Sequence, residues 1–118
     1  MTGRSELYAL LAASAPLAAL VGNRIFPVPV PDKTPIPCIG YLQSGGNPEQ
    51  TLSGVTMANR STIEVWCIAD DGEEADEIGD VVQEIARESN FTVPTGRRPE
   101  YELEEGLVAT VVTVDVWS

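Results

Sequence analysis

The stretch from Ser61 to Ala86 constrains the fold most, because it joins a strand pattern directly to a helix pattern. Ile63, Val65 and Cys67 recur at every second position, which is the period of a pleated strand. After Asp70-Asp71-Gly72, apolar residues recur in steps of three and four, as they do along one face of a helix. Those residues are Ala75, Ile78, Val82 and Ile85. The stretch therefore predicts a strand that leads into a helix, and by itself it indicates no chemistry.

Acidic residues crowd the first turns of that predicted helix. Asp70 or Asp71 is a natural N-cap, and carboxylates near a helix N-terminus are stabilised by the helix dipole. The spacing does not match an EF-hand loop, so we interpret residues 70–77 as a solvated helix start and not as a calcium site. Gly79 is unusual inside a helix, and it predicts the close approach of another part of the backbone.

The N-terminal part predicts a helix over residues 4–21 that is interrupted at Ser14. Ser14 followed by Pro16 is typical of a cap that starts a second short helix, and Gly22 is a typical helix stop. The run is shorter than a membrane span, and Glu6 and the helical spacing favour a folded helix over a secretion signal. Residues 24–37 contain five of the nine prolines. We expect an extended crossing or edge strand there, acting as a connector and not as a proline-rich ligand.

A further strand is predicted at residues 37–43, and the strand described above spans residues 60–69. Between them, residues 44–59 predict a long polar loop. This loop is either an arm that reaches a neighbouring subunit or a hairpin tip, and the sequence favours neither. Residues 91–93 predict a brief strand before a turn at 94–96, and residues 104–106 predict a hairpin turn with glycine at positive φ.

The last strand, residues 107–117, is rich in β-branched residues on both of its faces. We therefore expect it to be central in the sheet, or to present its second face to another subunit. The layout predicts an α+β fold, a small antiparallel or mixed β-sheet with two main helices packed on one face, and residues 1–118 form a single domain.

Composition excludes several classes of function. The chain has 18 acidic and 7 basic residues and no histidine, for a net charge of −11. This charge opposes general binding to nucleic acids and to anionic lipid, and it indicates solubility, repulsion of DNA or a basic partner. Without histidine there is no Cys–His or Ser–His pair, and there is no glycine-rich phosphate loop. Cys38 and Cys67 lie in apolar runs and predict buried thiols, so we expect no metal site, no cofactor and no enzyme.

Four blocks in order along the chain resemble the small tail-completion or tail-terminator-like proteins of long-tailed bacteriophages. The blocks are LYALLAASAPLAALVGNRIFP at residues 7–27, PIPCIGYLQ after the proline-rich gap, STIEVWCIADDGEEADEIGDVVQEI, and a closing strand that ends in VDVW. The resemblance implies helices on a small sheet, no catalytic residues, and a virion protein assembled in the host cytoplasm. It implies a ring, typically a hexamer, that terminates the tail tube and joins it to the head connector.

A ring of identical subunits needs two unlike contact surfaces. The long loop and the second face of the last strand are the candidates, and the predicted interface residues are Asn47, Glu49, Gln50, Thr51, Leu52, Val55, Met57, Trp66, Val111 and Trp117. Acids that line the channel would let DNA pass without binding. The candidates are Glu73, Glu74, Asp76, Glu77, Glu104 and Glu105. The alternative function is an acidic protein-binding module, such as a DNA-mimic inhibitor or an adaptor.

Overall fold

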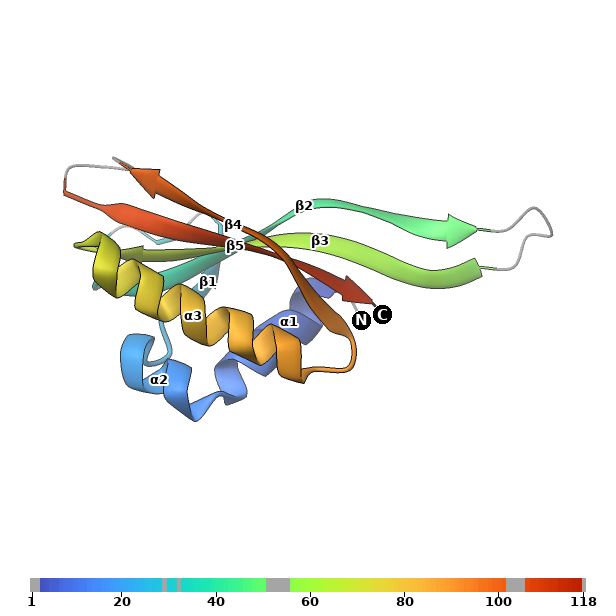
Figure 1. The fold of residues 1–118 in the computed structure, drawn as a ribbon, viewed down its shortest axis with the longest axis horizontal. Helices are drawn as coiled ribbons and strands as arrows, with labels where there is room; N and C mark the ends of the chain where they lie inside the picture. Colours follow the sequence, from blue (N-terminus) through green and yellow to red (C-terminus); the bar gives the residue numbers. More distant parts are fainter. Residues whose placement is uncertain (1–2, 29, 32, 51–55, 102–105, 118) are drawn as a thin grey trace.

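A mixed β-sheet with the strand order β1-β2-β3-β5-β4 organises the chain in the computed structural model (Figure 1). The structure describes residues 3–28, 30–31, 33–50, 56–101 and 106–117. Within these ranges, five strands form the sheet: β1 (Ile25–Pro27), β2 (Cys38–Gln50), β3 (Thr56–Ala69), β4 (Thr92–Tyr101) and β5 (Val108–Trp117). The short β1 is parallel to β2, and the other neighbours are antiparallel. The predicted α+β class is confirmed.

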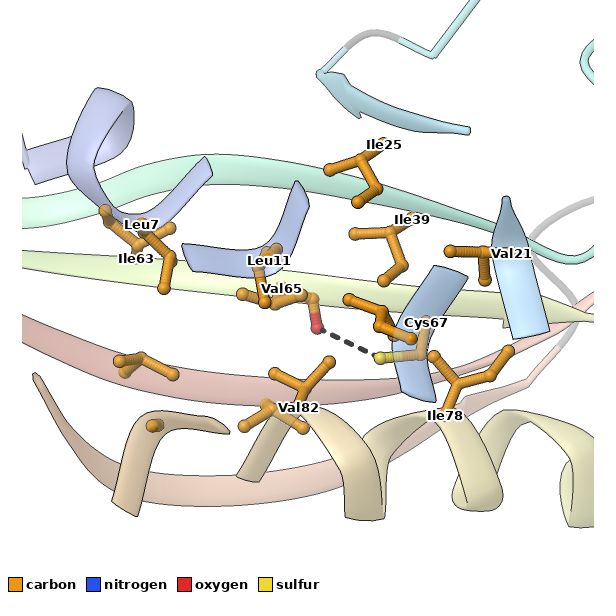
Figure 2. Close-up of a cluster of buried hydrophobic side chains, with 14 of the residues drawn as sticks. Leu7, Leu11, Val21, Ile25, Ile39, Ile63, Val65, Cys67, Ile78 and Val82 are labelled. Atoms are coloured by element: carbon orange, nitrogen blue, oxygen red, sulfur yellow. Dashed lines mark hydrogen bonds between the residues drawn. The ribbon is translucent and has the colours of Figure 1, made fainter. Parts of the chain in front are cut away.

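The helices α1 (Gly3–Ala13), α2 (Ala15–Val21) and α3 (Gly72–Glu88) cover one face of this sheet (Figure 1). Leucines of the two N-terminal helices meet the apolar face of α3 and the inward side chains of β3 and β5 (Figure 2). The most deeply buried side chains are Leu7, Leu11, Leu17, Ile39, Ile63, Ile78, Val21, Val65, Val82, Val111, Val112 and Val114. All of these except Val111 lie in or near the layer between sheet and helices, which forms the core. We call the side of the sheet opposite the helices the open face.

The start and end of the second helix follow the sequence prediction. The Ser14 side chain accepts a hydrogen bond from the Leu17 amide at 3.2 Å and caps α2. Gly22 ends that helix with φ of +61°. The proline-rich segment then adds β1 to the edge of the sheet, and the side chains of Val28 and Val30 lie over Gly40 of β2. Both cysteines are buried and free, as predicted.

The prediction of a long loop at residues 44–59 is wrong over most of its length. β2 continues to Gln50 and β3 begins at Thr56, so a long hairpin replaces the loop. The hairpin extends past the helices along the longest axis of a molecule that measures 52 × 26 × 22 Å (Figure 1). Pairing with β3 imposes the extended backbone despite Gly45, Gly46 and Pro48, and two register shifts accommodate these residues.

A strand does begin in the predicted stretch 91–93, but the predicted turn at residues 94–96 is wrong. β4 is continuous from Thr92 to Tyr101, and its register against β5 shifts between Pro94 and Gly96. This bulge holds one extra residue, so the alternation of side chains reverses beyond it. As a result Arg97 reaches α3 on the covered face, whereas its neighbour Arg98 lies on the open face. β5 lies between β3 and β4, which confirms that it is central.

Candidate assembly surfaces

The first candidate surface is the projecting end of the β2–β3 hairpin. Past the pair Asn47–Arg60, where β3 stops pairing with β5, the described strands pair only with each other. We call residues 45–50 and 56–59 the arm. The arm carries the backbone of four predicted interface residues, Asn47, Glu49, Gln50 and Met57. The predicted Thr51, Leu52 and Val55 lie outside the described residues.

The open face carries a compact cluster around the predicted interface residue Trp66. The guanidinium carbon of Arg98 lies 5.7 Å from the centre of the Trp66 ring, which is cation–π geometry. Glu64 Oε1 accepts hydrogen bonds from Trp66 Nε1 at 3.2 Å and from Arg98 Nη2 at 3.3 Å. Arg98 Nε also donates to Glu100 Oε1 at 2.9 Å. These contacts fix Trp66 in one orientation on the sheet.

Val111 differs from the other predicted interface residues because the single chain already buries it completely. It pairs in register with Trp66 on one side and with Arg98 on the other, the two residues that stack together. Val111 therefore presents no side-chain surface in the single chain, whereas the neighbouring Trp66–Arg98 pair does, and an interface at this place stays a prediction. Sequence reasoning missed Arg98, because the bulge in β4 decides which of two consecutive arginines shares a face with Trp66.

At the other end of β5, Trp117 is 39% exposed on the open face. Arg60 lies with its guanidinium carbon 5.9 Å from this ring. The Arg60 Nε atom is buried and has no hydrogen-bond partner within the described part of the chain. Val93, which pairs in register with Asp115, is 50% exposed beside this end of the strand. Aromatic and arginine side chains in such an arrangement are typical of protein–protein contacts.

The acidic start of α3 is a capped helix end, with one carboxylate in a structural role. Asp71 Oδ1 accepts a hydrogen bond from the Glu74 amide at 2.7 Å, which confirms the predicted N-cap. Asp76 Oδ1 accepts hydrogen bonds from Thr110 Oγ1 at 2.7 Å and from Arg97 Nη2 at 3.3 Å. The Thr110 hydroxyl and then the Arg97 guanidinium lower the pKa of Asp76.

Arg97 is the centre of this structural contact. Its Nη1 donates to Asp80 Oδ1 at 2.6 Å and to Gln83 Oε1 at 2.7 Å, and its Nη2 also donates to the Asp76 backbone carbonyl at 2.9 Å. We call Arg97 with Asp76, Asp80 and Thr110 the clip, because it ties α3 to β4 and β5. Among the candidate channel acids, Glu73 and Glu77 are exposed, Glu74 is half-buried, and Asp76 is exposed but engaged in the clip. Glu104 and Glu105 lie outside the described residues.

A groove opens between the junction of α1 with α2 and the second half of α3. Its volume is about 620 Å³. The lining is mainly apolar and includes Leu10, Ala13, Pro16, Ile85 and Phe91, with Glu84 and Glu88 among its polar residues. The sequence pattern gave no sign of this groove, because it depends on how the three helices pack.

Within the described ranges, no group of three or more metal-binding side chains comes together. The helices of the described chain are too short or too polar to cross a membrane. Three helices on one face of a mixed sheet, a projecting arm and an open face that carries Trp66 and the exposed Trp117 define a small α+β domain.

Comparison with known proteins identifies the family to which this domain belongs. The model of the family described as "Tail completion protein gp17" matches residues 5–108, and the chain belongs to this family. The protein is therefore a structural protein of a phage tail, as the resemblance implied. No curated protein matches the sequence.

The fold also matches a chain of a solved particle structure. That structure is titled "Virion of native gene transfer agent (GTA) particle", and the match has a TM-score of 0.74 at 15% sequence identity. It covers 94% of this chain and 90% of the other. At this level of identity the match establishes a shared fold over nearly the whole chain.

Proposed function

We propose that the protein forms a ring at the head-proximal end of a phage tail, where it terminates the tail tube and joins it to the head connector. The observation that carries this proposal is the family match over residues 5–108. The projecting arm supports it, because a subunit in a ring needs one surface that reaches a neighbour and a different surface that receives it. The ring contains six copies and assembles in the host cytoplasm.

The partners in this proposal are further copies of the chain, the tail-tube protein and the head connector. Trp66 and Trp117 on the open face, together with the arm, provide the contacts to these partners. Trp117 is exposed and Trp66 is half-buried beside Arg98. These side chains support the role, because tryptophan and arginine dominate the binding energy of many protein interfaces.

Tail-tube growth in a purified system tests the proposal. Adding the protein to polymerising tube protein should stop elongation, because a ring on the growing end covers the surface to which the next subunits bind. Tube length is measured by electron microscopy over time. The proposal is wrong if the tubes elongate at the same rate with and without the protein. A stable monomer that binds a basic enzyme would instead support the acidic binding module.

The exposed acids at the start of α3 line the channel in this proposal, and they keep DNA from binding to its wall. A negative wall repels the phosphate backbone at short range, and salt screens the repulsion. We expect the double variant Glu73→Lys and Glu77→Lys to make the assembled ring retain duplex DNA in a filter-binding assay at low salt.

The matched control replaces the same two residues with glutamine, which removes the charge without reversing it. The glutamine variant should bind DNA less than the lysine variant does. Equal and negligible DNA binding by the wild type and both variants would place these acids away from the channel.

A further inference from the structure

The arm lacks support within its own chain. A two-stranded ribbon in water is marginally stable, and it becomes stable when a third strand or another surface covers it. Beyond Asn47 and Arg60, the described part of the arm has only its own two strands. It also runs past the ends of the helices (Figure 1). A surface that covers the arm would therefore come from another molecule.

The composition of the arm favours a second copy as that molecule. Residues 44–59 contain one charged residue, Glu49, although the chain as a whole has a net charge of −11. Two copies repel each other wherever their acidic surfaces meet, so a contact between copies needs a segment with little charge. Depletion of charged residues is also the compositional mark of an interface core.

The groove between the helices offers matching chemistry. Its apolar lining from Leu10, Ile85 and Phe91 can exclude water from a polar strand that carries few charges. Glu88 and Glu84 provide carboxylate acceptors, and Glu84 also lies 3.5 Å from Arg87. In the described chain, no strand pairs with the outer edge of β2 from Gly45 to Gln50, so alternate residues along this edge present amide donors. Amide donors on the arm are therefore complementary to the carboxylate acceptors in the groove.

From these observations we infer that the arm of one copy docks in the groove between the α1–α2 junction and α3 of the next copy, an inference that rests on the proposed ring. The two surfaces are different parts of the chain, so the contact is head-to-tail and each copy both gives an arm and receives one. Such contacts repeat around an axis and close into a ring without a second type of interface.

Cross-linking between subunits tests the inference directly. Both native cysteines are buried, so cysteines introduced on the surface react selectively with a short bismaleimide. We expect the double variant Gln50→Cys and Glu88→Cys to give a ladder of covalent oligomers in assembled rings. The matched control, Gln50→Cys with Glu73→Cys, places the second thiol on the first turn of α3, outside the groove, and should give little product.

A pair of tryptophan substitutions provides the second test. Ala12 and Ala13 are both exposed on α1, but only Ala13 lines the groove. Ala13→Trp fills the groove and should lower ring assembly by about tenfold or more in sedimentation, the size of effect expected at an interface hot spot. Ala12→Trp should assemble as the wild type does. Circular dichroism verifies that both variants are folded.

The outcomes separate this inference from the proposed function. The groove is not the docking site if the wild type forms rings and Ala13→Trp assembles normally. The same conclusion follows if the Glu73→Cys control cross-links as well as the Glu88→Cys variant. In both cases the proposed ring itself is unaffected. If the wild type forms no ring alone or on tail tubes, the proposed function and this inference both fail.

Discussion

Gly79 shows how one residue fixes the distance between α3 and the sheet. Glycine inside a helix costs about 1 kcal/mol relative to alanine. A Cβ atom at this position would lie 2.9 Å from Thr110 Cγ2 and 3.2 Å from Arg97 Nη2. The sequence predicted the approach of another backbone here, and the structure corrects this to two side chains of the clip. Thr110 is buried and β-branched, so it cannot move aside.

Gly79→Ala should therefore destabilise the protein by about 1–2 kcal/mol, because the overpacking outweighs the gain in helix propensity. Urea unfolding followed by circular dichroism measures the change. Gly72→Ala is the matched control in the same helix, since no atom outside the immediate chain lies within 4 Å of its added Cβ. That variant should stay within about 0.5 kcal/mol of the wild type. A more stable Gly79→Ala protein would show that α3 is not held at this distance.

At the scale of the elements, the clip ties α3 to the two strands beneath it. The Asp76 side chain is 62% exposed and the Arg97 side chain is 25% exposed, so solvent screens the charges in part. The hydroxyl of Thr110 and the guanidinium of Arg97 nevertheless lower the pKa of Asp76. A lowered pKa in the folded state means that the carboxylate contributes stability above the pKa of the unfolded chain, about 3.9, and loses it as the pH falls through the folded pKa.

Asp76→Asn should lower the free energy of unfolding at pH 7 by about 1 kcal/mol and have a smaller effect at pH 2, where a larger fraction of the wild-type carboxylate is protonated. Urea unfolding at both pH values measures the difference. Glu77→Gln, an exposed neighbour in the same helix, should leave the stability nearly unchanged at both. An equal loss at pH 7 and pH 2 for Asp76→Asn would indicate a packing defect and not the loss of a charged contact.

The elements that could be predicted from sequence are those with strong local signals. The caps at Ser14 and Asp71 and the periodicity of α3 depend on residues a few positions apart, so the chain shows them directly. The arm was predicted as a loop because Gly45, Gly46 and Pro48 disfavour strands, whereas pairing with β3 overrides that preference. Pairing between two strands of this kind leaves no pattern in the sequence of either strand alone.

The candidate surfaces were less predictable than the fold. Trp66 was found by alternation along β3, but its partner Arg98 depends on the bulge between Pro94 and Gly96. Arg97 was missed for the same reason, since regular alternation from Thr92 would direct it away from α3. The groove requires the packing angles of three helices, which no single stretch of sequence determines.

At the scale of the whole molecule, the candidate contact surfaces lie on different parts of the fold. The helices cover one face of the sheet and the arm extends along the longest axis (Figure 1). Trp66 and Trp117 lie on the open face, as their places in the register show. Two prolines in the edge strand β4, Pro94 and Pro99, remove amide donors and limit strand addition at that edge. Contacts through side chains and through the arm therefore dominate the proposed assembly, and they suit a ring better than an open fibre of paired strands.

Electron cryomicroscopy of tails purified with the protein tests the central claim most directly. The account predicts a single ring of this chain at the head-proximal end, where the tail tube stops, and no copies elsewhere along the tail. Tails assembled without the protein should lack this ring and should not join to heads. Copies along the length of the tube or at the distal tip, or normal joining of heads to tails that lack the protein, would contradict the account.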